Sequence, residues 1–188
     1  MTAELSDQLR SIALHESGHT IVALALCISV KRVYMTAAYG AVRGQTECCW
    51  PPGTKRSRLV AMLCAGVLAS NNCTHLQLFV PPPDVVCEPP DSTAARREMR
   101  ALKRFRFNQT AVESGSTWSG DLGTIKAVLA GCKHPTAIYS HGESIARACL
   151  DRNERLLRSV AQRLLYEGEV SGGALARLAK DVTTYKHM

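Results

Sequence analysis

Residues 9–26 of the chain read LRSIALHESGHTIVALAL, and their spacing predicts a helix. Residues suited to a buried face recur every three or four positions, at Leu9, Ile12, Ala13, Glu16, His19, Val22, Ala23 and Leu26. Within this stretch, His15-Glu16-Ser17-Gly18-His19 has the pattern H-E-x-x-H. Residues four apart lie on one face of a helix, one turn above the other. His15 and His19 are therefore predicted to point two imidazoles at one ion.

This pattern supplies a particular set of chemical groups in a single helical turn. Two neutral imidazoles are good zinc ligands, and the adjacent Glu16 carboxylate can act as a general base toward a water held by the metal. Gly18 has no side chain, which would let another segment, or a substrate, approach the metal closely. The competing interpretation is an ordinary histidine pair with Glu16 as a surface carboxylate. The helical context favours the metal-binding interpretation.

Length and composition predict one domain over residues 1–188, mainly α-helical with a small β-sheet (an α+β fold). A chain of 188 residues is long enough for one well-buried core and short for two. The apolar fraction is 46% and the aromatic fraction only 5%. This balance is typical of an aliphatic, helix-rich globular protein.

Beyond the first helix, the pattern predicts two strands over residues 31–36 and 41–47, followed by a loop at 50–53. Helices are expected over residues 58–70, 121–130, 143–167 and 174–182, with a Ser/Gly-rich loop at 113–120. The prolines between residues 81 and 90 predict an irregular Pro-rich loop.

The eight cysteines contain no C-x-x-C pair, and several lie in apolar segments, so free thiols are expected. A second metal site, built from Cys73, His75 and the adjacent Cys48 and Cys49, is the less favoured alternative. No pair among these residues has the spacing of a zinc knuckle.

The net charge of +7 is concentrated in a predicted basic helix over residues 96–106. Such a helix can bind an acidic partner or nucleic acid. A solvated helix face is favoured, and nucleic-acid binding is not expected, because no nucleic-acid motif accompanies the charges. The longest apolar run, residues 21–30, is about half a membrane span, and the first residues are unlike a secretory leader. We therefore expect a cytoplasmic protein with no membrane partner.

A catalytic zinc ion usually has three protein ligands, so His15 and His19 require a third from elsewhere in the chain. The candidates are Glu113, Asp121, Glu143 and three histidines, His75, His134 and His141. Asp121 is favoured because it follows the Ser/Gly-rich loop and is predicted to begin a helix. The residue types alone leave open that Asp121 is only a helix N-cap.

The chain resembles the peptidase domain of FtsH-type membrane-anchored AAA proteases. In that family the zinc helix reads H-E-A-G-H, and Ser17 stands here in place of the alanine. Residues 65–70 (AGVLAS) weakly echo the family's Gly-Gly-Arg-x-Ala-Glu helix. Residues 115–122 (GSTWSGDL) match the Asp-Leu of the motif that carries the family's third zinc ligand. The resemblance therefore implies that Asp121 is the third ligand.

The resemblance also implies an FtsH-peptidase-like fold, one Zn²⁺ per chain and a zinc endopeptidase with Glu16 as its catalytic base. The 188 residues contain no Walker A motif, so substrates are expected to be peptides or unfolded proteins cleaved without ATP. A homo-oligomer and a separate ATPase partner are the associations that the family suggests. The alternative is a non-catalytic zinc module that binds an acidic partner or nucleic acid through residues 96–106.

Overall fold

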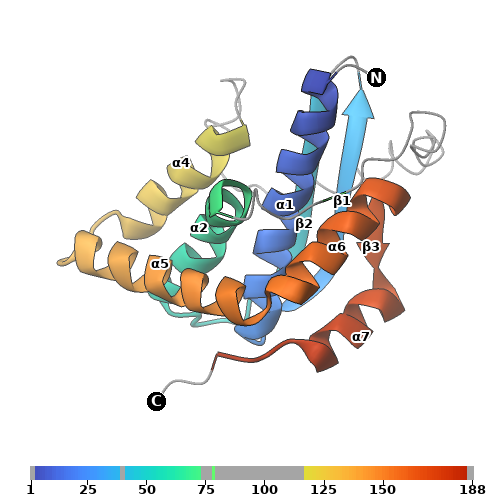
Figure 1. The fold of residues 1–188 in the computed structure, drawn as a ribbon. Helices are drawn as coiled ribbons and strands as arrows, with labels where there is room; N and C mark the ends of the chain where they lie inside the picture. The colour runs from blue at the N-terminus through green and yellow to red at the C-terminus, as the bar shows by residue number, and fades with distance from the viewer. Residues whose placement is uncertain (1–2, 39–40, 73–77, 79–116, 186–188) are drawn as a thin grey trace.

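Helix α1 (Ala3–Ala25) is the central element of the fold (Figure 1). It contacts α2 (Arg56–Asn72), α6 (Glu154–Glu167) and the two long strands of the sheet. The computed structural model describes residues 3–38, 41–72, 78 and 117–185. Residues 13–23 of α1 are buried without interruption. A helix covered on all sides has no need of a polar face, which explains the apolar sequence around the H-E-x-x-H motif.

The sheet has three antiparallel strands in the order β2-β1-β3. Strands β1 (Ser29–Ala38) and β2 (Ala41–Cys49) form a long hairpin, and β3 (Glu169–Ser171) pairs with the other side of β1. Val33 of β1 lies opposite Thr46 on one side and Val170 on the other. Strand β2 is therefore an edge strand of the described sheet, and it packs on α1.

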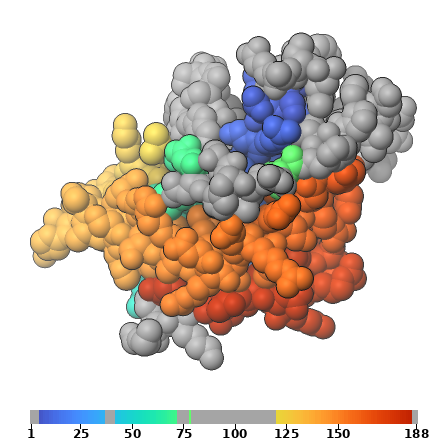
Figure 2. All heavy atoms as spheres, viewed as in Figure 1, coloured from blue at the N-terminus to red at the C-terminus, as the bar shows by residue number. Residues whose placement is uncertain are grey.

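The remaining helices are α4 (Thr117–Leu129), α5 (Pro135–Arg152) and α7 (Gly172–Asp181). Helix α2 packs between α1 and α5, and α4 packs on α2 and α5. On the face shown in Figure 2, residues of α5, α6 and α7 form the lower part of the surface. The chain is mainly helical with a small antiparallel sheet, so the α+β fold expected from the sequence is confirmed.

The strands and most helices lie close to their predicted positions, but three predictions were wrong. The helix expected over residues 143–167 is two helices, α5 and α6, separated at Asn153. Residues 117–120 belong to α4 and not to the loop expected at 113–120. Gly172 and Gly173 belong to α7, whereas the last helix was expected to begin after them, at residue 174.

Several predicted features lie outside the described residues. These are the Pro-rich loop at 81–90, the basic helix at 96–106, and residues 113–116 of the Ser/Gly-rich loop. Among the helices that the structure describes, none combines the length and the apolar character needed to cross a bilayer.

Candidate metal centre

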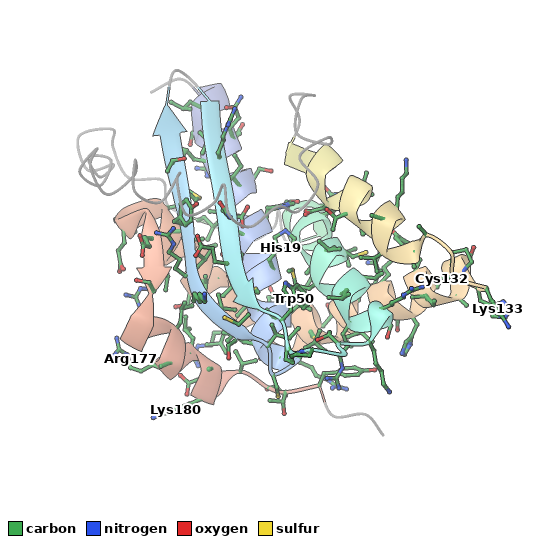
Figure 3. The ribbon with its side chains drawn as sticks, turned by 180° about the vertical axis from the view of Figure 1, so that it is seen from behind. His19, Trp50, Cys132, Lys133, Arg177 and Lys180 are labelled. Carbon is green, nitrogen blue, oxygen red and sulfur yellow. The ribbon has the colours of Figure 1, made fainter. Side chains whose placement is uncertain are left out.

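His15 and His19 of α1 converge with Asp121 of α4. The Nε2 atoms of the two histidines are 3.0 Å apart. Asp121 Oδ2 lies 3.1 Å from Nε2 of His15 and 3.2 Å from Nε2 of His19. Three potential ligand atoms thus form a nearly equilateral triangle. Figure 3 shows His19 on α1, between β2 and α2.

The triangle has the size of a metal-binding site. Zinc ligands at about 2.0–2.1 Å in tetrahedral geometry are roughly 3.3 Å from one another. Asp121 Oδ2 is buried and receives no well-formed hydrogen bond from the described residues, although both ring nitrogens lie within ion-pair distance. Three potential ligand atoms that lie this close together suit a cation among them, so this His-His-Asp group can bind a metal ion.

His19 is oriented by a bond from its other ring nitrogen. Nδ1 lies 2.7 Å from the Met62 carbonyl oxygen of α2. Because a carbonyl can only accept, Nδ1 carries the proton of this bond, and Nε2 of the neutral ring keeps its lone pair for a metal. Metal-binding histidines commonly have such a partner, which fixes both the tautomer and the orientation of the ring.

Gly66 of α2 makes room for both imidazoles. A Cβ atom at this position would lie 2.6 Å from His15 Cε1 and 2.6 Å from His19 Nε2. Gly66 comes one turn after Met62, so residue 66 has no side chain that could cover the carbonyl that binds His19. Gly18 serves the same interface, because a Cβ there would lie 2.5 Å from the backbone oxygen of Ala65. The two helices can therefore approach each other closely at the metal site.

Asp121 lies in the second turn of α4 and is not an N-cap, which settles one alternative that the sequence left open. Ile125, one turn later on the same face, is buried in the core and anchors that face of α4. Burial alone raises the pKa of the Asp121 carboxyl, but the interactions with His15 and His19 outweigh it and hold the pKa well below its usual range. Asp121 therefore carries a negative charge in the cluster.

The pKa of His19 is the result of opposing effects. Burial lowers it, whereas the close and negatively charged carboxylate of Asp121, the charge of Glu16 and the Met62 carbonyl raise it. The second group prevails, and the pKa of His19 rises to about 8. The surroundings of the His19 ring thus favour a positive charge, which either a proton or a metal ion can supply.

Glu16 of α1 follows His15 in the sequence, and its side chain is buried where α1 packs on β2. Its Oε2 accepts a hydrogen bond of 2.8 Å from the Thr46 hydroxyl. Ser17 is also buried, and its hydroxyl donates to the Ala13 carbonyl at 2.6 Å. The Ser17 hydroxyl is thus bonded within its own helix.

The other candidates for the third ligand do not join the triangle. Glu143 forms an ion pair of 2.7 Å with Arg147 on the exposed side of α5. His134 and His141 are exposed at the beginning and in the middle of α5. Glu113 and His75 lie outside the described residues.

The cysteines are free thiols wherever the structure describes them. Cys48, on the face of β2 that carries Thr46, is half-buried, and its pKa is raised to about 12 by burial, by Cys49 and by Glu16. A protonated thiol is a poor metal ligand. Cys48 and Cys49 form no second metal cluster in the described part of the chain, while Cys73 and His75 lie outside it.

The sequence singled out His15, His19 and Asp121, which the structure brings together, and Glu16 beside them, but it gave no role to Met62, Gly66 or Thr46. The small residues of AGVLAS at 65–70 were the available signal for the close helix contact. No protein-family model matches the chain, and no curated protein matches it.

Proposed function

We propose that the chain is a zinc metallopeptidase that hydrolyses peptide bonds in unfolded or flexible segments. The observation that carries this proposal is the triangle of His15, His19 and Asp121, with the Glu16 carboxylate held in the adjacent position of the same helix. Two imidazoles and one carboxylate suit zinc and match the ligand count of a catalytic site, in which the fourth position serves water or substrate. A purely structural zinc site has no need of a neighbouring base.

Each residue of the site has its own role in the proposed reaction. His15, His19 and Asp121 hold the metal, which supplies Lewis-acid polarisation of the scissile carbonyl and acidifies water. Glu16 accepts a proton from the attacking water as the carbon–oxygen bond forms. It then gives that proton to the leaving amine as the carbon–nitrogen bond breaks, so the carboxylate is regenerated.

Strand β2 is the proposed docking edge for the substrate. Met35 N–H of β1 donates to Gly168 on the β3 side, at 2.8 Å. The backbone N–H and C=O groups of successive residues point to opposite sides of an antiparallel strand. Because those of Met35 point toward β3, those of Tyr34 point toward β2 and face the backbone groups of its partner Gln45. Gly44 and Thr46 then direct their backbone groups to the outer edge. An extended peptide can pair there with little sequence preference, which suits unfolded substrates.

The resemblance to FtsH-type peptidase domains belongs to the same proposal. The zinc helix and the Asp-Leu pair at residues 121–122 support it. A homo-oligomer and a separate ATPase partner are further proposals that rest on this resemblance alone. The non-catalytic alternative depends on residues 96–106, which lie outside the described residues, and no described contact favours it.

The first test compares the wild type with Glu16→Gln for zinc content and cleavage of an unfolded, casein-like substrate. We expect one zinc per chain in both proteins and chelator-sensitive cleavage in the wild type only. Cleavage by Glu16→Gln at the wild-type rate would contradict the mechanism, and absence of zinc would contradict the site.

Peptides with N-methylated backbone nitrogens test the docking edge, because loss of main-chain hydrogen bonds should raise KM.

A further inference from the structure

The carboxylate of Glu16 touches β2 at two residues. Thr46 binds one of its oxygens, and Gly44 lies against the rest of the side chain. Gly44 and Thr46 are two positions apart, so both face α1 from the same side of β2. Strand β2 therefore places two different residues against the proposed base: Gly44, which has no side chain, and Thr46, which has a hydroxyl group.

Gly44 provides the space in which the carboxylate lies. A Cβ atom at Gly44 would lie 2.7 Å from Oε1 and 2.8 Å from Cδ of Glu16, with Cγ also in contact. These distances are too short for any side chain, so residue 44 must be glycine for Glu16 to keep this position. The contact involves the carboxylate end of the side chain and not the backbone of α1.

The hydrogen bond from Thr46 fixes the orientation of the Glu16 carboxylate. Its hydroxyl is 2.8 Å from Oε2 and 3.1 Å from the backbone oxygen of Glu16. The terminal torsion of a glutamate is broad, so an unrestrained carboxylate samples many orientations. The bond to Oε2 leaves Oε1, which lies against Gly44, as the oxygen that would take the proton of the attacking water.

We propose that Thr46 is a positioning residue, which orients the Glu16 carboxylate for proton transfer in the space left by Gly44. The inference rests on the proposed peptidase function and adds a role for β2 beyond that of a docking edge. Proton transfer requires the base within hydrogen-bond reach of the proton, so a carboxylate free to turn spends less time in the productive orientation. Loss of the bond should therefore lower kcat and leave zinc binding unchanged.

The test uses Thr46→Val and Thr46→Ser in peptide hydrolysis, with zinc content measured on the same samples. Valine keeps the shape of the side chain and removes the hydroxyl, whereas serine keeps the hydroxyl. We expect Thr46→Val to lower kcat by roughly 10- to 100-fold with little change in KM. Thr46→Ser should retain most of the wild-type kcat.

Thr20→Val is the matched control. The Thr20 hydroxyl also donates to Glu16, at 2.8 Å, but only to its backbone oxygen. If the effect at Thr46 came from the backbone of α1, Thr20→Val would reproduce it. We expect Thr20→Val to keep kcat close to the wild-type value.

Unchanged kcat in Thr46→Val, loss of kcat in Thr46→Ser, or a change in KM alone would each overturn the positioning role. A second measurement does not depend on activity: a urea-unfolding cycle of Thr46→Val and Glu16→Ala, singly and together. A coupling between the two substitutions supports the contact, and strict additivity contradicts it. If the wild type proves to lack peptidase activity, the proposed function fails, while this cycle still decides whether Thr46 holds the carboxylate.

Discussion

His19 shows how the surroundings of one side chain control both metal binding and protonation. Nδ1–H of His19 donates a hydrogen bond to the Met62 carbonyl oxygen, and Asp121 lies 3.2 Å from Nε2. The same negative charge that attracts a metal ion also attracts a proton, and it raises the pKa of His19 to about 8, against the effect of burial. A proton and a metal ion therefore compete for Nε2 near neutral pH.

This competition predicts that apparent zinc affinity rises with pH below about 8 and levels off above it. Below the pKa, zinc must displace a proton from His19, so affinity should fall by about tenfold for each unit of decreasing pH. Titration against a fluorescent zinc chelator of known pH dependence measures this slope. An affinity that does not change between about pH 6 and pH 8 would show that His19 is neutral throughout.

The contact between α1 and α2 depends on two glycines with different neighbours. Gly18 of α1 faces the Ala65 carbonyl and the Ala69 side chain, whereas Gly66 of α2 faces the two imidazoles. Alanine has the better intrinsic helix propensity, by about 1 kcal/mol. Helix propensity therefore disfavours glycine at both positions, whereas the close packing of α1 on α2 favours it.

Alanine at these two positions should separate stability from metal binding. Gly18→Ala meets backbone atoms that cannot move away, so we expect it to lower the free energy of unfolding by about 1–3 kcal/mol. Gly66→Ala displaces the ligand rings, so we expect zinc affinity to fall by more than tenfold. Urea unfolding and the chelator titration measure the two effects.

Gly120→Ala in α4 is the control for this pair. A Cβ at Gly120 meets nothing within 4 Å, so only the gain in helix propensity remains. We expect this variant to be as stable as the wild type or slightly more stable. If Gly18→Ala behaves in the same way, the close contact with Ala65 does not limit stability.

The three residues of the candidate metal centre come from two distant parts of the chain and meet only in the folded molecule. Asp121 is 102 positions beyond His19, and α4 is held in place chiefly by α2 and α5. A metal bound by His15, His19 and Asp121 joins α1 directly to α4. Binding energy of this kind adds to the stability of the whole fold.

We therefore predict that zinc raises the melting temperature. Free zinc at a hundred times its Kd contributes about 2.7 kcal/mol, which corresponds to roughly 5–10 °C for a chain of this size. Differential scanning calorimetry with and without chelator measures the shift. Glu16→Gln should retain the shift and Asp121→Ala should lose it, whereas a shift of equal size in Asp121→Ala would exclude Asp121 as a ligand.

The break between α5 and α6 shows why a local pattern was insufficient. The helical spacing of apolar residues continues from Ile145 to Leu164, so a single helix was expected. Asn153 instead bonds to the chain 30 positions later: its Oδ1 accepts from Thr183 N–H at 2.7 Å, and its Nδ2 lies 3.2 Å from the Thr183 oxygen. A contact with so distant a segment leaves no periodic signal.

The local sequence by itself determined that His15, Glu16 and His19 lie together in one helical turn, because this placement follows from helical periodicity alone. It reduced the third ligand to a short set of candidates, and the tertiary structure brought Asp121 to the other two. Only the tertiary structure placed Gly44, Thr46, Met62 and Gly66 around the site. Their roles depend on close approach between α1, α2 and β2, and the distances between packed elements are set by the whole core and not by the spacing of residues along the chain.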